Sequence, residues 1–285
     1  MPSVITLTTD FGLNDAYVAC MKGVILGINP KAMIVDISHS VEPQNIAQAA
    51  FLLHTAYRYF PDDTIHVVIV DPGVGSKRKA IVLDTQSAYF IAPDNGVLSY
   101  IINELFPSED TVSHSISRVH FTKKIKEHID AISITNSEFW FHPVSTTFHG
   151  RDIFAPVAAH LSLGVSMRKF GGAISSINVI PLLIPYYDSA DNLVGHVLHI
   201  DHFGNLITNI KNNKIASDTI NMKVGEHNIT RTSKYYAERE GLAFVSGSSG
   251  YLEISLTNGN AAAFLGTRIG DQVKLSVKKR NRNNI

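Results

Sequence analysis

Residues 64–75 read TIHVVIVDPGVG, the clearest boundary between a strand and a loop in the chain. The first part, residues 64–70, is a short apolar run rich in β-branched side chains, which predicts a buried strand. The run ends on Asp71, and the Pro-Gly turn that follows predicts a loop at the carboxyl end of this strand.

Strand and helix signals alternate upstream of this strand. Such alternation predicts a mostly parallel sheet with helices on both faces. Ligands of these sheets bind beyond the carboxyl ends of the strands, so the loops that begin at Asp10 and Asp71 are expected to form a site. The predicted elements are strands at residues 4–8 and 32–37 and helices at residues 18–28 and 46–57.

The character of the chain changes near residues 181–191, where Pro, Tyr and Asp predict a linker. Short apolar runs separated by Gly, Asn and Ser follow, which predict a small antiparallel barrel or sandwich. We therefore predict an N-terminal α/β domain over residues 1–185, whose mostly parallel sheet is flanked by helices, and a C-terminal antiparallel β-barrel-like domain over residues 191–285. The other predicted elements are a polar surface stretch at 107–129, a helix at 153–163, and strands at 194–200, 206–210, 242–245, 252–256 and 272–277.

The composition argues against several classes of protein. The 285 residues include 25 Lys+Arg and 25 Asp+Glu, and this zero net charge argues against binding nucleic acid through a basic field. A single cysteine permits no intrachain disulfide and fits a reducing compartment. Neither a signal peptide nor an apolar stretch of membrane-spanning length is found. We expect a cytoplasmic protein with no nucleic-acid or membrane partner, in which thirteen histidines hint at chemistry.

The loop that follows the 64–70 strand is the densest candidate site. Residues 70–78, VDPGVGSKR, combine an acid at a strand end, two glycines that let a ligand approach the backbone, and cations. A tight turn with a solvated basic tip accounts for the same residues. A phosphate-binding P-loop is excluded because the Gly-Lys-Ser/Thr order and the following helix are missing.

Two other loops carry candidate side chains. Residues 147–152, TFHGRD, place His149 on a loop before a helix, where it can act as a base, while Asp152 suits the positive end of the helix dipole. Residues 8–15, TTDFGLND, place Asp10 at a strand end, where a carboxylate can bind the diol of a ribose. Asp15 suits capping of the following helix equally well.

The second predicted domain contains a histidine-rich segment, residues 196–205. Its three histidines alternate between the two faces of a strand, so we expect no shared zinc ion and no metal. Asp201 and Asn205, on either side of Phe203, better suit a loop that holds a polar ligand against an aromatic ring. Residues 247–250, GSSG, form a second loop of small side chains.

Seven motifs follow one another along the chain: TDFG at 9–12, DISH at 36–39, VDPGVG at 70–75, APDNG at 92–96, FHGRD at 148–152, DHFGN at 201–205 and SSGYL at 248–252. In this order they resemble the S-adenosylmethionine hydroxide adenosyltransferase family, whose relatives are the halogenases that form adenosyl fluoride and chloride. The resemblance runs nearly end to end, and the polar stretch at 109–129 is its least matched part.

The resemblance implies roles for particular residues. Asp71, Arg78 and His149 match the Asp-Arg-His triad that handles water in the family. Asp10 matches the position that binds the ribose diol. The remaining substrate-binding positions are Asp15 and Asp201 for the methionine ammonium, Ser248 and Ser249 for its carboxylate, Asn205 and the backbone near Ala261 for the adenine edge, Phe203 and Tyr236 for the adenine face, and Phe148 and Gln44 for the reaction centre.

The chain departs from the halogenases at the reaction centre. Asp71 and His149 stand where halogenases carry aromatic side chains, Gly150 replaces a serine that contacts the halide, and Gln44 replaces a tryptophan. A carboxylate at Asp71 would repel a halide ion. We therefore predict hydrolysis of S-adenosyl-L-methionine by in-line attack of water at C5′, which gives adenosine and L-methionine. Ser249 stands where halogenases have an arginine, which leaves the carboxylate contact open.

The resemblance also implies that S-adenosylmethionine is the substrate, that no cofactor is needed, and that the protein is a homotrimer with active sites at subunit interfaces. Three alternatives stay open: a halogenase that forms 5′-chloroadenosine, a metallohydrolase that uses Asp10, Asp71 and His149, and a non-catalytic protein that binds adenosyl ligands. The sequence leaves open whether Asp71 or His149 is the base.

Overall fold

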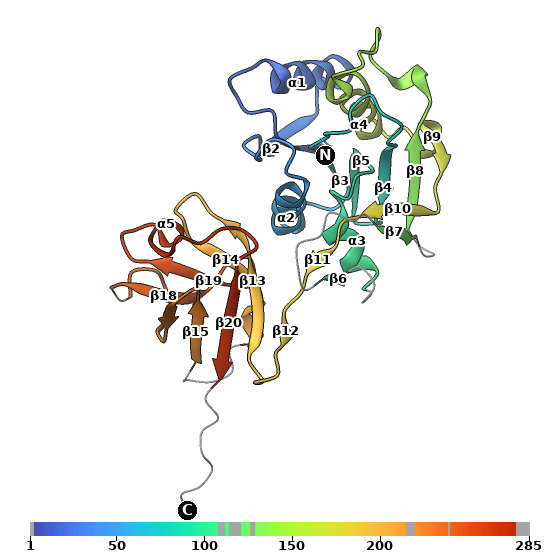
Figure 1. The fold of residues 1–285 in the computed structure, drawn as a ribbon. Helices are drawn as coiled ribbons and strands as arrows, with labels where there is room; N and C mark the ends of the chain where they lie inside the picture. The colour runs from blue at the N-terminus through green and yellow to red at the C-terminus, as the bar shows by residue number, and fades with distance from the viewer. Residues whose placement is uncertain are drawn as a thin grey trace, which may run out of the picture. The chain divides into compact units, whose positions relative to one another are not determined.

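The computed structural model describes residues 3–107, 112–113, 121–125, 129–214, 220–238 and 240–277. These residues form two compact units (Figure 1). Unit 1 comprises the described part of residues 1–111 and 118–181, and unit 2 that of residues 112–117 and 182–285. The domain boundaries at residues 185 and 191 stay a prediction. Within the described part of the chain, no helix combines the length and apolar character that a membrane crossing requires.

Unit 1 is built on a seven-stranded sheet, which in spatial order consists of β2 (Met33–Ser38), β1 (Val4–Thr9), β3 (Thr64–Ile69), β5 (Ala88–Pro93), β4 (Ala80–Asp84), β8 (Asp130–Ile134) and β9 (Gly171–Ala173). The first four strands are parallel neighbours. Strand β4 runs antiparallel to both β5 and β8, so β8 points the same way as β5. The prediction of a mostly parallel sheet is confirmed.

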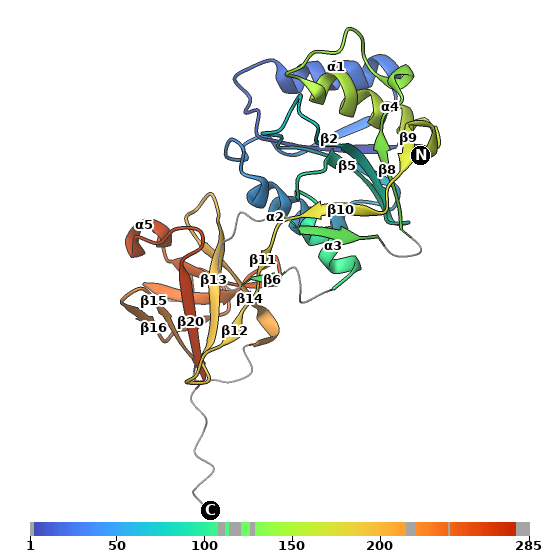
Figure 2. The same cartoon turned by 45° about the vertical axis from the view of Figure 1, so that its right-hand side comes forward.

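Helices cover both faces of this sheet (Figures 1 and 2). All six residues of β3 are buried, and their side chains alternate between the faces. Ile65 and Val67 belong to the core cluster that includes residues of α1 and α4, whereas Val68 belongs to the cluster with α2 and α3. The helices are α1 (Tyr17–Ile28), α2 (Ile46–Ala56), α3 (Ser99–Leu105) and α4 (Ala155–Ser162).

Three details of unit 1 differ from the expectations. The strand expected to be buried at residues 32–37 is β2, which is only partly buried because it lies at the edge of the sheet. The β4–β5 hairpin was not predicted. The helix expected at residues 153–163 begins earlier, as a π-helix over Gly150–Phe154 that continues into α4.

Unit 2 contains a curled sheet, ordered β16 (His227–Ile229), β15 (Ile220–Val224), β20 (Gln272–Val277), β13 (Leu193–Ile200), β14 (Leu206–Lys211), β19 (Tyr251–Leu256), β18 (Leu242–Ser246) and β17 (Thr232–Ser233). β12 (Tyr186–Tyr187) also pairs with β13, and the short helix α5 (Ala261–Leu265) contacts β19. Neighbouring strands are antiparallel except β17 and β18. Residues of β16 lie close to β18, so the sheet curls around a single apolar cluster. The predicted antiparallel, barrel-like architecture is confirmed.

The polar stretch predicted at residues 107–129 lies partly outside the described residues. Its described part contains two short strands, each of which pairs with a strand beyond residue 175. The pairs are β6 (Val112–Ser113) with β11 (Leu182–Leu183) in unit 2, and β7 (Phe121–Lys124) with β10 (Ser176–Val179) in unit 1; single helical turns lie at Tyr57–Tyr59, Ser137–Phe139, Met167–Lys169 and Asn212–Lys214.

Candidate active site

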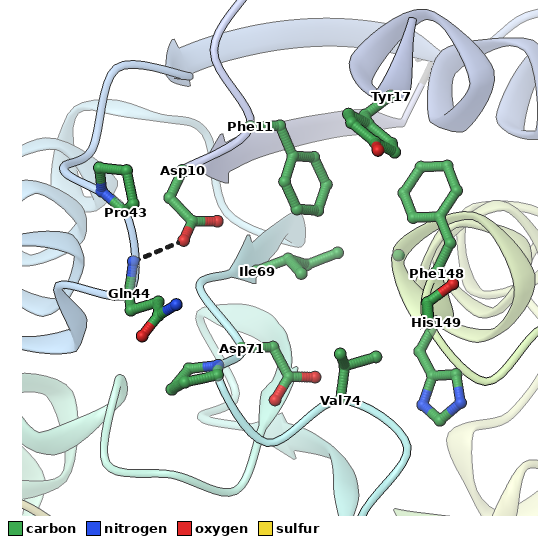
Figure 3. A pocket seen from close by; sticks show the side chains of 13 residues that line it. Asp10, Phe11, Tyr17, Pro43, Gln44, Ile69, Asp71, Val74, Phe148 and His149 are labelled. Atoms are coloured by element: carbon green, nitrogen blue, oxygen red, sulfur yellow. Dashed lines mark hydrogen bonds between the residues drawn. The ribbon is translucent and has the colours of Figure 1, made fainter. Parts of the chain in front are cut away.

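The carboxyl ends of β1 and β3 border a cavity of about 600 Å³ in unit 1 (Figure 3). Asp10 follows β1 and Asp71 follows β3, and both side chains line the cavity. This is the position that the sheet topology predicts for a ligand site. The other walls come from residues 43–44 and 147–150. The sheet thus brings together the three loops that were singled out in the N-terminal half.

Arg78 joins Asp71 to His149. The Arg78 Nε donates to Asp71 Oδ1 at 3.0 Å and to Oδ2 at 2.8 Å, and Nη2 also donates to Oδ2. The same Nη2 lies 3.0 Å from His149 Nδ1. Only 5% of the Asp71 side chain and 11% of the Arg78 side chain are exposed, so solvent screens these interactions weakly. Arg78 therefore contacts both of the other side chains matched to the family's triad.

This contact determines the protonation of His149. A guanidinium can only donate, so His149 Nδ1 accepts the hydrogen bond from Arg78, and the proton of a neutral ring lies on Nε2. Burial, and then the positive charge of Arg78, lower the pKa of His149, although Asp71 and Asp152 oppose the shift. Both effects favour the neutral imidazole.

A close backbone contact holds the 71–78 turn against the loop that carries His149. Gly75 has a φ of +77°, and a Cβ at this position would lie 2.5 Å from the Thr146 carbonyl oxygen. Both the conformation and the space therefore require glycine. The turn places the Arg78 guanidinium within hydrogen-bonding distance of His149.

The loop before α4 is fixed by its own hydrogen bonds. The Asp152 carboxylate, which is fully buried, accepts from the Ser145 N–H at 2.8 Å, and Ser145 Oγ accepts from the Phe148 N–H at 2.9 Å. Asp152 thus ties the preceding loop to the π-helix, in addition to lying in the first turn of that helix. Single π-turns occur frequently at functional sites, and this one directly follows His149.

A chain of polar side chains lies beneath the Asp10 loop. Asp10 Oδ2 accepts from the Gln44 backbone N–H at 2.8 Å (Figure 3). The neighbouring Thr9 Oγ1 is hydrogen-bonded to His39 Nδ1 at 2.9 Å, and His39 Nε2 lies 3.0 Å from Asp36 Oδ1. Both Thr9 and His39 are buried. His39, matched only as part of the DISH motif, therefore supports the segment that presents Asp10.

Unit 2 holds a second cavity, of about 770 Å³. Asp201 accepts hydrogen bonds from the backbone N–H groups of Phe203 and Asn205 and from Asn205 Nδ2. Its carboxylate therefore shapes the 201–205 loop as well as facing the cavity. Residues matched to the family's substrate-binding positions line it: Asp201, Phe203, Asn205, Tyr236, Ser248 and Ser249.

Glu253 lines the same cavity and was not predicted. Glu253 is only 4% exposed, and its Oε2 accepts a hydrogen bond from the Tyr236 hydroxyl at 2.6 Å. Burial, and then the nearby charge of Asp201, raise the pKa of Glu253 against the effect of the Tyr236 hydrogen bond. A Cβ at Gly247 would lie 2.0 Å from Glu253 Oε1, so the glycine makes room for the carboxylate. The sequence feature that could have identified Glu253 is a charged residue within a predicted strand, LEIS at residues 252–255.

Three matched positions line neither cavity: Arg78, which contacts the lining residues Asp71 and His149, and in addition Asp15 and Ala261. Asp15 is exposed, and the N-cap of α1 is Ala16 with no side-chain hydrogen bond, so the capping interpretation of Asp15 is wrong. Ala261 is fully buried at the start of α5. Among the residues that the structure describes, no three His, Cys, Asp or Glu side chains are grouped closely enough to hold a metal ion.

Comparison with solved structures supports the fold. The chain is similar to the crystal structure of an uncharacterized conserved protein from Thermotoga maritima, with a TM-score of 0.83 and 34% identity over 96% of this chain and 100% of the other. A conserved hypothetical protein from Thermus thermophilus gives a TM-score of 0.71 at 28% identity, over 96% and 100% of the two chains.

Comparison with curated proteins points to one family. The chain is 36% identical to the (R)-S-adenosyl-L-methionine hydrolase of Methanocaldococcus jannaschii over 95% of each chain, and 32% identical to that of Salinispora tropica over 95% of this chain and 97% of the relative. A fluorinase of an Actinoplanes species is 27% identical over 73% and 71% of the two chains. Residues 5–171 match the model of the SAM hydroxide adenosyltransferase N-terminal domain, and residues 195–274 match that of the C-terminal domain. The chain belongs to the SAM hydroxide adenosyltransferase family.

Proposed function

We propose that this protein is an S-adenosyl-L-methionine hydrolase, which releases adenosine and L-methionine by attack of water at C5′. The observation that carries the proposal is the hydrogen-bonded set of Asp71, Arg78 and His149 at the cavity, in a chain whose full-length relatives bear the name of this hydrolase. S-adenosylmethionine and water are the proposed substrates, and we propose that no cofactor takes part.

The proposed reaction needs no general acid, because the leaving group departs as a neutral thioether. As the bond from water oxygen to C5′ forms, the C5′–S bond breaks and its electron pair converts the sulfonium into the neutral thioether of methionine. The remaining product is a protonated alcohol, and its proton must pass to a base. Bulk water has a pKa of about 15.7, but the attacking oxygen becomes strongly acidic as the new bond forms. A weak base therefore suffices.

We assign Asp71 as this base. The lone pair of His149 Nδ1 is occupied by the hydrogen bond from Arg78, and Nε2 carries the ring proton. The Asp71 oxygens also accept from Arg78, but a carboxylate has about four acceptor sites and retains some of them. Proton transfer to a positioned base contributes roughly 10²–10⁴-fold to the rate, and near-attack positioning roughly 7–11 kcal/mol. Positioning of the water by this set is accordingly the larger contribution.

The remaining matched residues are proposed to hold the substrate. Asp10 binds the ribose diol, and Gln44 and Phe148 border the reaction centre. We propose that the others bind adenine or methionine: Asp15, Asp201, Phe203, Asn205, Tyr236, Ser248, Ser249 and the backbone near Ala261. We further propose that the protein is cytoplasmic and forms a homotrimer with active sites at subunit interfaces. Sedimentation equilibrium of the purified protein tests the trimeric state.

A halogenase is the alternative within the same family. The fluorinase relative is more distant and matches a smaller share of the chain than the hydrolases do. The carboxylate of Asp71 lines the cavity and would repel a halide ion approaching C5′. We therefore expect added chloride to produce no 5′-chloroadenosine.

The proposal is tested by incubating the purified protein with S-adenosylmethionine and measuring products by chromatography and mass spectrometry. We expect adenosine and methionine in equal amounts, at a rate that a metal chelator does not change. Asp71→Asn should lower turnover by roughly 10²–10⁴-fold but retain ligand binding. Asp62→Asn, at an exposed carboxylate outside the cavity, should retain both. Saturable binding without any adenosine would contradict the proposal and favour a non-catalytic binding protein.

A further inference from the structure

The cavity of unit 1 has an aromatic side, and two of its three rings, Phe11 and Tyr17, have no role in the proposed chemistry. The rings of Phe11, Tyr17 and Phe148 all line the cavity. The distance between ring centroids is 5.6 Å for Phe11 and Tyr17, 5.7 Å for Phe11 and Phe148, and 5.0 Å for Tyr17 and Phe148. Figure 3 shows them at one edge of the cavity, opposite Asp71 and the His149 imidazole. We call these three rings the aromatic wall.

The rings of the aromatic wall differ in what already covers them. The Arg151 guanidinium lies over Phe148, 5.3 Å from its centroid, so one face of this ring already holds a cation. Tyr17 is 47% exposed, whereas Val18 and Met21 of the same helix are buried. Tyr17 and Phe11 are thus the rings with surface available to a ligand.

The charge of the cavity favours a cation. Its lining includes the carboxylates of Asp10 and Asp71 and contains no lysine or arginine; since Arg78, behind the lining, is paired with Asp71, the net negative charge comes from Asp10. A sulfonium carries no N–H or O–H, so it cannot donate a conventional hydrogen bond to a carboxylate. Aromatic rings attract such alkylated cations through the negative potential of their faces, which is how quaternary ammonium groups are recognised.

The direction of attack places the sulfur at this wall, an argument that rests on the proposed function. In an in-line displacement the leaving sulfur lies on the side of C5′ opposite the attacking water. Asp71, Arg78 and His149 hold the water at one edge of the cavity, so the sulfur points toward the other edge. That edge is formed by Phe11 and Tyr17 (Figure 3).

We propose that Tyr17 and Phe11 form the subsite for the sulfonium and make the cavity prefer cationic adenosyl ligands over neutral thioethers. The attraction is strongest in the bound substrate and fades as sulfur becomes neutral. The rings therefore contribute to substrate binding more than to the chemical step, and the neutral thioether product is held less tightly. Tyr17 and Phe11 are binding residues in this account.

The subsite is tested with two adenosyl ligands that lack a sulfonium and differ in charge at the position of the sulfur. S-adenosylhomocysteine is the neutral thioether, and sinefungin carries an ammonium-bearing carbon in place of the sulfonium. We expect Tyr17→Leu to lower the ratio of sinefungin affinity to S-adenosylhomocysteine affinity by about 3- to 30-fold in calorimetric titrations. Tyr17→Phe keeps the ring and should keep the ratio within about twofold. In turnover, Tyr17→Leu should raise KM by a similar factor without lowering kcat, because an attraction that fades toward the transition state does not assist the chemical step.

Tyr59→Leu serves as the matched control, because Tyr59 is 77% exposed and does not line the cavity. Phe11→Leu provides a second variant with the same expected direction. Equal weakening of both ligands in Tyr17→Leu and Phe11→Leu, or an unchanged ratio, would overturn the sulfonium subsite. Adenosine release from S-adenosylmethionine by the unmodified protein is measured in parallel. If adenosine is released but the affinity ratio is unchanged in the variants, only the sulfonium subsite is contradicted. If no adenosine is released, the proposed function is contradicted as well.

Discussion

Replacing Arg78 by methionine removes the cation that contacts both Asp71 and His149. The Asp71 side chain is 5% exposed, so Arg78→Met leaves a buried carboxylate without its ionic partner. Breaking a buried ion pair in this way costs about 3–5 kcal/mol. In the double variant Arg78→Met/Asp71→Asn no buried charge is left unpaired, so its cost should fall below the sum of the single costs by about 2 kcal/mol.

The assay can report on unit 1 alone. Trp140 is the only tryptophan in the chain and lies in unit 1, so its fluorescence during urea unfolding follows this unit. The same variant changes the titration of His149. Because the charge of Arg78 lowers the pKa of His149, Arg78→Met should raise that pKa, which an NMR titration of the ring protons measures.

The exposed pair Arg168 and Asp130 provides the control, because their side chains are 75% and 58% exposed at an Nη2–Oδ2 distance of 2.8 Å. The corresponding double-variant cycle there should give no resolvable coupling, as for many exposed ion pairs. Strictly additive costs for Arg78→Met and Asp71→Asn, or a lowered His149 pKa in Arg78→Met, would refute the reasoning.

Three further predictions concern His66, Gly75 and Asp10. Burial lowers the pKa of His66 to about 4, so the folded protein binds this proton more weakly than the unfolded chain. The stability of unit 1 should therefore fall by up to about 3 kcal/mol as the pH drops from about 6.5 to 4, and urea unfolding of His66→Gln should lack this component. Gly75→Ala forces a side chain against the Thr146 carbonyl at positive φ, and we expect about 1–3 kcal/mol of strain and a lower kcat, as measured by urea unfolding and steady-state kinetics. Gly164→Ala, also at positive φ but away from the cavity, should cost stability and leave kcat unchanged. Asp10→Asn keeps an acceptor for the Gln44 N–H but loses the charge facing the diol, so KM for S-adenosylmethionine should rise by about 10- to 100-fold in steady-state kinetics, and an unchanged KM would contradict the diol contact.

The sequence predicted the strands that border the site because their apolar runs end sharply. The TIHVVI run becomes β3 and places Asp71 at its carboxyl end, as expected. The β4–β5 hairpin was missed because its connection, DTQS at residues 84–87, contains neither Gly nor Pro. Instead Gln86 takes the positive φ, a conformation that the residue type does not announce.

The site was predicted unevenly for a similar reason. A motif at a strand end could identify Asp71 and a motif before a helix could identify His149, but the contact of both with Arg78 depends on how the 71–78 turn packs. Glu253 and Tyr17 were missed because their significance arises only from tertiary contacts. The local sequence indicates periodicity and turns. Tertiary packing determines which side chains, distant in the sequence, line the same cavity.

The measurement that tests the central proposal most directly follows the oxygen of water into product. The protein is incubated with S-adenosylmethionine in ¹⁸O-enriched water, and the adenosine and methionine are analysed by mass spectrometry with fragmentation of the ribose. Attack of water at C5′ predicts one ¹⁸O atom in the 5′-hydroxyl of adenosine and none in methionine. Adenosine with an unlabelled 5′ oxygen, or label in methionine instead, would contradict it.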